Sequence, residues 1–199
     1  MKITDIKRQV KRNDRYSIYG DDKYIFSLSE NELLNLGLKI GQEFDENELE
    51  ELRQKAVIDK AFDRSLNLIF RRRRSTWEMQ QYLKQKDYEA EIIETILNTL
   101  SIKGYLDDAA FAEAWVNSRR LLKNTSKRRL QQELRAKRVP DEIITQALEN
   151  DEADELEVLK ELIEKKRTQT RYKDKEKLMA YLIRQGYNYS DIKQALADG

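Results

Sequence analysis

MQQYLKQKDYEAEIIETIL, residues 79–97, is the first of three stretches that share one pattern; LQQELRAKRVPDEIITQAL at 130–148 and LMAYLIRQGYNYSDIKQAL at 178–196 are the others. Five positions are apolar or aromatic in every copy: Met79, Leu83, Tyr88, Ile93 and Leu97, then Leu130, Leu134, Val139, Ile144 and Leu148, then Leu178, Leu182, Tyr187, Ile192 and Leu196. The first two and the last two positions are four residues apart, which is the spacing of one helix face. The pattern predicts a pair of short helices used three times.

A further helix precedes each pair. We expect it from Glu46 to Arg72, from Asp108 to Leu122 and from Glu152 to Arg167, with Asp107 and Asp151 as N-caps of the second and third. The repeating unit is therefore three helices. Because about 50 residues bury too little surface to be stable alone, such units stack on their neighbours. The predicted fold is mainly α, with tandem three-helix repeats in an elongated, curved array.

The first 45 residues differ from the rest of the chain. RYSIY and KYIFSLS alternate in polarity on either side of GDDK, which predicts a β-hairpin. Ser29 with Glu32 and Asp45 with Glu48 have the spacing of capping boxes, so a short helix follows the hairpin. We expect four parts: a small β-rich module at 1–45 and three-helix repeats at 46–106, 107–150 and 151–199.

The composition excludes several classes of function. The 199 residues are 39% hydrophobic and 38% charged, which suits thin layers of amphipathic helices. There is no Cys and no His, which removes thiolate nucleophiles, imidazole bases and the usual zinc sites. No glycine-rich phosphate-binding loop is present. We expect no enzyme, no cofactor and no metal. The lack of a signal peptide or long apolar run predicts a cytoplasmic protein with no membrane contact.

Charges are strongly segregated although the formal net charge is only +1. Residues 117–138 hold nine basic residues and one acid, whereas residues 141–164 hold ten acids and one base. In each repeat, basic residues cover the end of the first helix and the start of the second. The candidate binding residues in these three clusters are Arg71, Arg72, Arg73, Arg74, Arg119, Arg120, Lys123, Lys127, Arg128, Arg129, Lys166, Arg167 and Arg171.

Cations at a helix C-terminus complement the helix dipole, which accounts for one or two bases at each helix end. It does not account for four consecutive arginines, or for bases that continue into the next helix start. Because equivalent positions line up in a stacked array, we expect the clusters to form a continuous positive band that binds a polyanion or an acidic partner. The near-neutral pI and the acidic blocks favour a protein assembly on DNA over bare duplex.

Several motifs together resemble a known family. Arg72, Ser75, Glu78 and Met79 fit RxxSxxEM, and YLKQK at 82–86, GYLDDAAFAEAWVNSR at 104–119 and RLQQELRAKRV at 129–139 follow in order. Over residues 60–149 this order and spacing resemble the RecX family of bacterial regulators of the recombinase RecA. The resemblance implies a protein without a catalytic centre that binds the RecA–DNA filament along its groove. Such proteins restrain filament growth, ATPase, strand exchange and co-protease activities.

Two features depart from that family pattern. Ser126 and Arg138 stand where members often have glycine, so Arg138 must tolerate a positive φ. Longer relatives also continue with further repeats. We expect a monomer whose partner is the RecA filament, with DNA inside the filament as a further contact. The alternative is a free single-stranded nucleic-acid-binding module that affects recombination only by competing for DNA.

Overall fold

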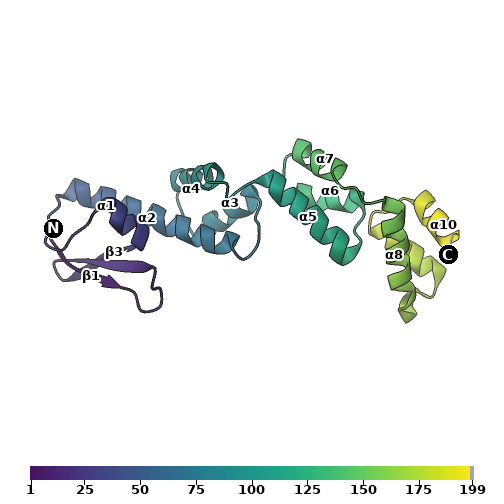
Figure 1. Cartoon of the computed structure of the whole chain (residues 1–199), viewed down its shortest axis with the longest axis horizontal. Coiled ribbons are helices and arrows are strands. Elements are labelled where there is room, and N and C mark those ends of the chain that lie inside the picture. The colour runs from purple at the N-terminus through teal and green to yellow at the C-terminus, as the bar shows by residue number, and fades with distance from the viewer. Residues whose placement is uncertain (198–199) are drawn as a thin grey trace. The chain divides into compact units, whose positions relative to one another are not determined.

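The structure, a computed structural model, describes residues 1–197 (Figure 1). Within this range the chain is mainly helical, with ten α-helices after a three-stranded sheet. It divides into two compact units: Met1–Arg72 with Met79–Tyr105, and Arg73–Glu78 with the chain from Leu106 onward. None of the described helices combines the length and the apolar character that a membrane span requires. The helical repeat class and the β-rich start are both as predicted.

The N-terminal module is an antiparallel sheet in the order β1 (Ile3–Arg8), β2 (Arg15–Gly20) and β3 (Lys23–Ser29). The predicted hairpin is β2–β3, and β1 adds a third strand. Asp21 and Asp22 turn the hairpin at φ 48° and 62°, the left-handed backbone that tight two-residue hairpin turns require. The predicted turn GDDK is therefore confirmed.

Two helices lie along this sheet in the first unit (Figure 1). They are α1 (Glu30–Leu36) and α2 (Glu46–Ile69), and Leu52 and Ala56 of α2 pack with Ile3, Ile18 and Leu28 of the sheet. Both predicted N-caps are present, but only the second is a complete capping box, because the Ser29 amide donates to Asp59 and not to Glu32. Ser29 Oγ accepts the Glu32 amide, and Asp45 and Glu48 form a complete capping box.

A buried arginine joins the sheet to α2. The Arg15 side chain is 3% exposed, and its Nη2 lies 2.9 Å from Asp59 Oδ2 while its Nη1 lies 2.8 Å from Asp63 Oδ2. Asp59 also accepts the backbone N–H of Ser29 at 2.9 Å, at the start of α1. Because a buried charge is costly unless it is paired, these bonds fix the sheet against α2.

The remaining helices follow the predicted trios. After α2 come α3 (Thr76–Lys84) and α4 (Ala90–Ile102); the second trio is α5 (Asp108–Lys123), α6 (Lys127–Ala136) and α7 (Asp141–Glu149). The third is α8 (Glu155–Arg167), α9 (Lys175–Arg184) and α10 (Tyr189–Ala197), with a 3-10 turn η1 (Thr170–Tyr172) before α9. In the second unit, the second and third trios each have a core cluster of their own.

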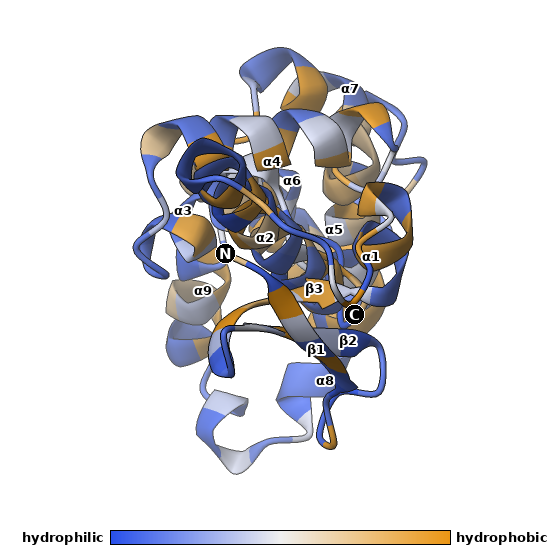
Figure 2. Ribbon diagram, turned by 90° about the vertical axis from the view of Figure 1, so that its left-hand side faces the viewer, coloured by the Kyte–Doolittle hydropathy of each residue, from blue (hydrophilic) through white to orange (hydrophobic). Residues whose placement is uncertain are grey.

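The fifteen repeated apolar positions form the inner faces of these trios. Twelve are buried, and Tyr88, Leu97 and Leu148 are half-buried. Figure 2 shows the result on the ribbon, where hydrophobic and hydrophilic residues share each helix. The pattern from which the fold was predicted is therefore the pattern of the core.

The turn between the second and third helices has the same backbone in every repeat. Asp87, Arg138 and Gly186 occupy equivalent positions and have φ of 58°, 56° and 92°. The expected positive φ at Arg138 is confirmed. The third position is also crowded: a Cβ at Gly186 would lie 2.7 Å from Ser126 Oγ, so a side chain there meets the neighbouring repeat.

One predicted N-cap is wrong. The helix α8 begins at Glu155 rather than Glu152, and Asp154 caps it by accepting the amides of Leu156 and Glu157. Asp151, the predicted cap, instead accepts two hydrogen bonds from Arg120 of the preceding repeat, at 2.9 and 2.7 Å. Asp107 does cap α5, through the amides of Ala109 and Ala110.

The junction between the second and third repeats is mainly polar. Arg120, 9% exposed, bonds Glu155 as well as Asp151. Asn124, at the end of α5, accepts the Tyr187 hydroxyl on its carbonyl oxygen at 2.7 Å. Ser126 Oγ donates to the carbonyl of Gln185 at 2.6 Å, as Ser75 Oγ does to Lys137 at 3.1 Å within the same unit.

A second contact recurs at the start of three helices. The amides of Ser29, Thr76 and Lys127 donate to the carboxylates of Asp59, Asp108 and Glu155, at 2.9, 2.8 and 2.9 Å. In each case the carboxylate comes from the first helix of the repeat that follows. An anion is stabilised at a helix N-terminus because the first amides have no acceptor inside the helix. Carboxylates of the first helices thus form joints between successive parts of the chain.

We expect Tyr187→Phe to lower the free energy of unfolding by about 1–2 kcal/mol, because it leaves the buried Asn124 carbonyl without its donor. Burial raises the pKa of the Tyr187 hydroxyl in the folded state, so the folded form favours the neutral phenol. The stabilisation is complete below the pKa of an unfolded tyrosine, about 10, and is lost as the pH rises above it. Urea unfolding should therefore show a difference in the free energy of unfolding between wild type and Tyr187→Phe that decreases above a pH of about 10. Tyr105→Phe, at an exposed ring, is the control. A difference in the free energy of unfolding that does not change with pH would contradict the hydrogen bond from the Tyr187 hydroxyl to Asn124.

Gly186→Ala should destabilise the chain by about 2–3 kcal/mol, through backbone strain and the contact with Ser126 Oγ. Gly104→Ala isolates the strain, because Gly104 has φ 71° but no atom within 4 Å of an added Cβ. It should cost about 1 kcal/mol. Thermal unfolding of both variants tests this, and equal losses would show that the third repeat does not pack closely on Ser126.

Candidate functional site

The candidate site consists of three basic corners, each lying between the first and second helices of a repeat. The first corner is Arg71–Arg74, directly after α2 and its C-cap Phe70. Arg71, Arg72 and Arg73 are exposed, and Arg74 is half-buried. This corner lies at the helix end that the sequence predicted, although α2 stops at Ile69 instead of Arg72.

The second corner, Arg119–Arg129, separates into structural and exposed members. Arg120 is used inside the molecule, because its guanidinium is held by Asp151, Glu155 and the Thr125 carbonyl. Lys127 is half-buried, and its backbone is the part that meets Glu155. Lys123, Arg128 and Arg129 are exposed, and within residues 1–197 only Arg129 has a nearby carboxylate, Glu133 at 3.6 Å.

Arg119 lies between these extremes. Its guanidinium carbon is 4.4 Å from the centroid of the Trp115 ring, and its Nε donates to Glu133 at 2.7 Å. The Trp115 indole N–H donates to the same carboxylate at 2.9 Å. Cation–π contact and ion pairing together fix the side chain, so Arg119 presents a rigid, partly exposed cation.

The third corner combines cations with tyrosines. Lys166 Nζ lies 5.6 and 5.0 Å from the ring centroids of Tyr172 and Tyr181, which are themselves 5.0 Å apart. Arg171 lies 5.8 Å from the Tyr172 centroid. Lys166 is half-buried under these contacts, whereas Arg167 and Arg171 are exposed.

The corners therefore contain two kinds of base. Exposed cations occur in all three corners, while Arg120 and the Lys127 backbone belong to the junction between repeats. The continuous positive band stays a prediction. The acids that join successive repeats, Asp108, Asp151 and Glu155, were not among the predicted functional residues. The sequence did contain a signal for them: serine stands at the equivalent positions 75 and 126, and acidic residues stand near the start of the first helix of the following repeat.

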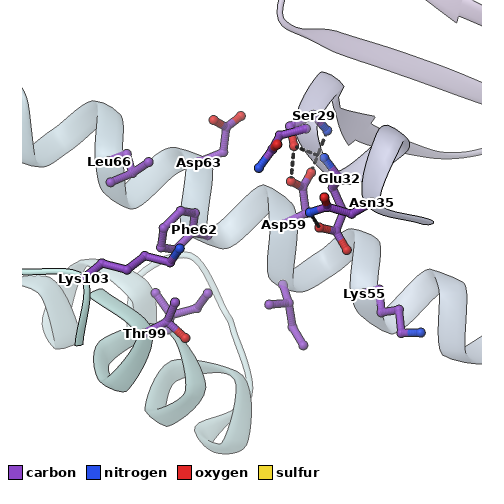
Figure 3. A pocket seen from close by; sticks show the side chains of 13 residues that line it. Ser29, Glu32, Asn35, Lys55, Asp59, Phe62, Asp63, Leu66, Thr99 and Lys103 are labelled. Carbon is purple, nitrogen blue, oxygen red and sulfur yellow. Dashed lines mark hydrogen bonds between the residues drawn. The ribbon is translucent and has the colours of Figure 1, made fainter. Parts of the chain in front are cut away.

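A cavity of about 390 Å³ lies in the first unit, between α1, α2 and α4 (Figure 3). Phe62 and Leu66 line it with Lys103, whose Nζ is 6.0 Å from the Phe62 ring centroid. Its carboxylates already accept hydrogen bonds: Glu32 from Asn35, Asp59 from Ser29, and Asp63 from Arg12 and Arg15. The cavity thus offers no pair of unengaged acids for acid–base chemistry.

Metal chemistry finds no support in residues 1–197. No three Asp or Glu side chains in this range are grouped so that they could hold a metal ion. What the arrangement offers is binding: exposed guanidinium and ammonium groups, some held rigidly on aromatic rings, beside acidic helices of the same chain.

Comparison with family models gives four matches along the chain. The RecX N-terminal domain matches residues 1–45, and the first, second and third three-helix domains of RecX match residues 61–100, 107–148 and 152–196. The matches are in the order of the elements described above. They cover the sheet module, the end of α2 with α3 and most of α4, and nearly all of the second and third trios.

Individual relatives agree with the family models. The chain is 35% identical to a regulatory protein RecX of Halalkalibacterium halodurans over 98% of its own length and 77% of the relative, and 30% identical to one of Bacillus subtilis over 98% and 75%. A crystal structure of regulatory protein RecX superposes with a TM-score of 0.71 at 27% identity, covering 98% of both chains. By its sequence and its fold, the chain belongs to the RecX family.

Proposed function

We propose that the chain binds the RecA–DNA filament and modulates, mostly by inhibiting, the recombinase, ATPase and co-protease activities of RecA. The observation that carries the proposal is the match of the whole chain, sheet module included, to regulatory proteins of the RecX family. The chain acts by binding and carries out no chemistry of its own. This is consistent with the absence of Cys and His from the sequence.

The surface chemistry supports this role. Exposed cations at the basic corners lie in a chain whose first helices begin with acidic residues, so the surface carries both signs of charge. A filament of protein subunits around DNA also carries both signs. Complementary charges orient the encounter and accelerate it, and they discriminate against partners with the wrong pattern. Arg71, Lys123, Arg128 and Arg167 are the contacts we assign to the filament first.

Free single-stranded nucleic-acid binding is the second candidate. It is favoured by the exposed bases of the second corner, Lys123 and Arg128, which have no carboxylate partner among the described residues. In this case any effect on RecA comes only from competition for DNA.

We expect the triple charge reversal Arg71→Glu, Lys123→Glu and Arg128→Glu to weaken inhibition of DNA-stimulated ATP hydrolysis by RecA at least about tenfold, because each exposed charge contributes up to about 1 kcal/mol. All three side chains are exposed, so the helical circular dichroism and the unfolding temperature should change little. The measurement is the concentration for half inhibition.

The matched control reverses three exposed lysines away from the corners: Lys23→Glu, Lys39→Glu and Lys84→Glu. It changes the net charge by the same amount. Inhibition that is lost in the corner variant and retained in the control supports a role for the corners. Unchanged inhibition by the corner variant would show that these three residues do not bind the filament.

Salt dependence separates the two candidates. Binding dominated by phosphate contacts falls linearly in log affinity with log salt, with a slope of roughly −0.7 per neutralised phosphate on single strands. A filament modulator should bind preformed RecA filaments more tightly than bare single strands at the same salt. Tighter binding to bare DNA, with the steeper slope, would favour the competing module.

A further inference from the structure

A further cavity of the first unit lies where the loop between β1 and β2 meets the end of α2 and the helix α3. Its volume is about 460 Å³, and we call it the loop cavity. Residues 11–14 of the loop form one side. The other side consists of Arg64, Asn67 and Leu68 of α2, Arg71 just after that helix, and Tyr82 of α3. The residues of α2 share one helix face, because they are three and four positions apart.

The loop is fixed against α2 without a ligand. Arg12 Nη2 donates to Asp63 Oδ2 of α2 at 2.8 Å and to Asp14 Oδ2 in the loop at 3.1 Å. The amide of Arg15 donates to the Arg12 carbonyl at 3.0 Å, which closes the loop at its base. The cavity is therefore preformed. Asp14, the one carboxylate among the lining residues, is already paired.

Three cations of the lining have no carboxylate partner within residues 1–197: Lys11, Arg64 and Arg71. Arg64 is half-buried, and its Nη1 donates to the Tyr88 hydroxyl at 3.0 Å. This neutral partner fixes the guanidinium and leaves its charge uncompensated. A cation taken partly out of water without an ion pair is costly, so an anion in the cavity would be stabilising.

The helix dipole accounts for only one of these charges. Arg71 follows the C-terminus of α2, where a cation is favoured. Arg64 lies before the last turn of that helix, and Lys11 comes from a different element, the loop. Cations from two separate parts of the chain thus line the same cavity. Their arrangement suits a bound anion better than it suits a helix end.

A phosphate fits these cations better than a carboxylate does. Phosphate oxygens are arranged tetrahedrally, so cations on several sides can each bond a different oxygen, and the guanidinium fork matches this geometry. A carboxylate has two oxygens in one plane, which Arg64 alone could satisfy. Leu68 and the Tyr82 ring, both half-buried, add an apolar side, and Lys86 Nζ lies 5.9 Å from the centroid of that ring. An aromatic ring beside cations is a common contact for a nucleobase.

We propose that the loop cavity binds the phosphate of a nucleotide, with the sugar or base of that nucleotide against Tyr82 and Leu68. Lys11, Arg64 and Arg71 bond the phosphate oxygens. The nucleotide is either a unit of a single strand or a free nucleotide, because both present a phosphate beside a base. The site is distinct from the second and third basic corners.

The test adds three probes separately to the full-length 15N-labelled protein at one ionic strength: oligothymidine, thymidine triphosphate and oligoglutamate. We expect saturable shifts of the amides of Lys11, Asn13 and Asn67 with a nucleotide probe and none with oligoglutamate at the same charge concentration. Tighter binding of oligothymidine, at equal phosphate concentration, identifies a strand as the ligand. Tighter binding of thymidine triphosphate identifies a free nucleotide.

Lys11→Glu should weaken nucleotide binding at least about tenfold, because a charge-assisted bond is replaced by repulsion. Lys11 is exposed, so the unfolding temperature should change little. The matched control is Lys23→Glu, at an exposed lysine of the same sheet. Arg64→Met, which keeps the aliphatic part of the side chain, should give a similar loss of binding. Thermal unfolding shows whether the lost bond to Tyr88 affects the fold.

Three outcomes would overturn the proposal. The first is no saturable shift at the loop cavity with either nucleotide probe, including the case in which only the amides of Lys123 and Arg128 shift. The second is an equal response to oligoglutamate, which would make the cavity a general anion contact. The third is unchanged binding by both Lys11→Glu and Arg64→Met.

The result is independent of the proposed function. RecA is absent from the titrations, and Lys11 and Arg64 are not among the residues assigned to the filament. Lys11→Glu that loses nucleotide binding and still inhibits ATP hydrolysis by RecA would support the loop cavity and leave the filament contacts as proposed. Corner variants that lose inhibition while Lys11→Glu binds nucleotides normally would do the reverse.

Discussion

A carboxylate bound to the first amides of an earlier helix is the contact on which the repeats depend. Asp59, Asp108 and Glu155 each make it, from the first helix of one repeat to a helix start in the part of the chain before it. The geometry is that of anion binding at a helix N-terminus, here between parts of one chain. Because the amides have no acceptor within their own helix, the contact satisfies groups that would otherwise need water or a side-chain cap.

The joints matter because the cores are small. The second and third trios hold separate clusters of buried residues, which share no side chain. A chain with 38% charged residues has few apolar groups to spare for broad contacts between repeats. The connections are made instead by buried or half-buried polar groups such as Arg120, Asn124 and Tyr187, with geometry that fixes one register. These polar contacts specify the orientation and spacing of neighbouring repeats more strictly than apolar contact alone would.

The helical trios could be predicted from the sequence because the apolar spacing has one structural solution. Most predicted caps were correct as well, since Ser29, Asp45 and Asp107 stand directly before their helices. The roles of individual charges could not be predicted. Arg120 and Arg128 stand in the same basic stretch, yet Arg120 is half-buried and paired with acids 31 and 35 residues away, whereas Arg128 faces solvent. Asp151 was misassigned for the same reason: whether an acid caps its own helix or joins another repeat depends on which groups the fold brings close.

Separate cores connected by polar joints also determine how such a chain comes apart. Stability in a linear array is close to the sum of each repeat's own stability and its interfaces with its neighbours. The third trio, with its own cluster around Leu159, Leu182 and Ile192, can open while the second stays closed. In such an array amide exchange includes local openings of single repeats as well as global unfolding, and each repeat is stabilised by its joints to its neighbours.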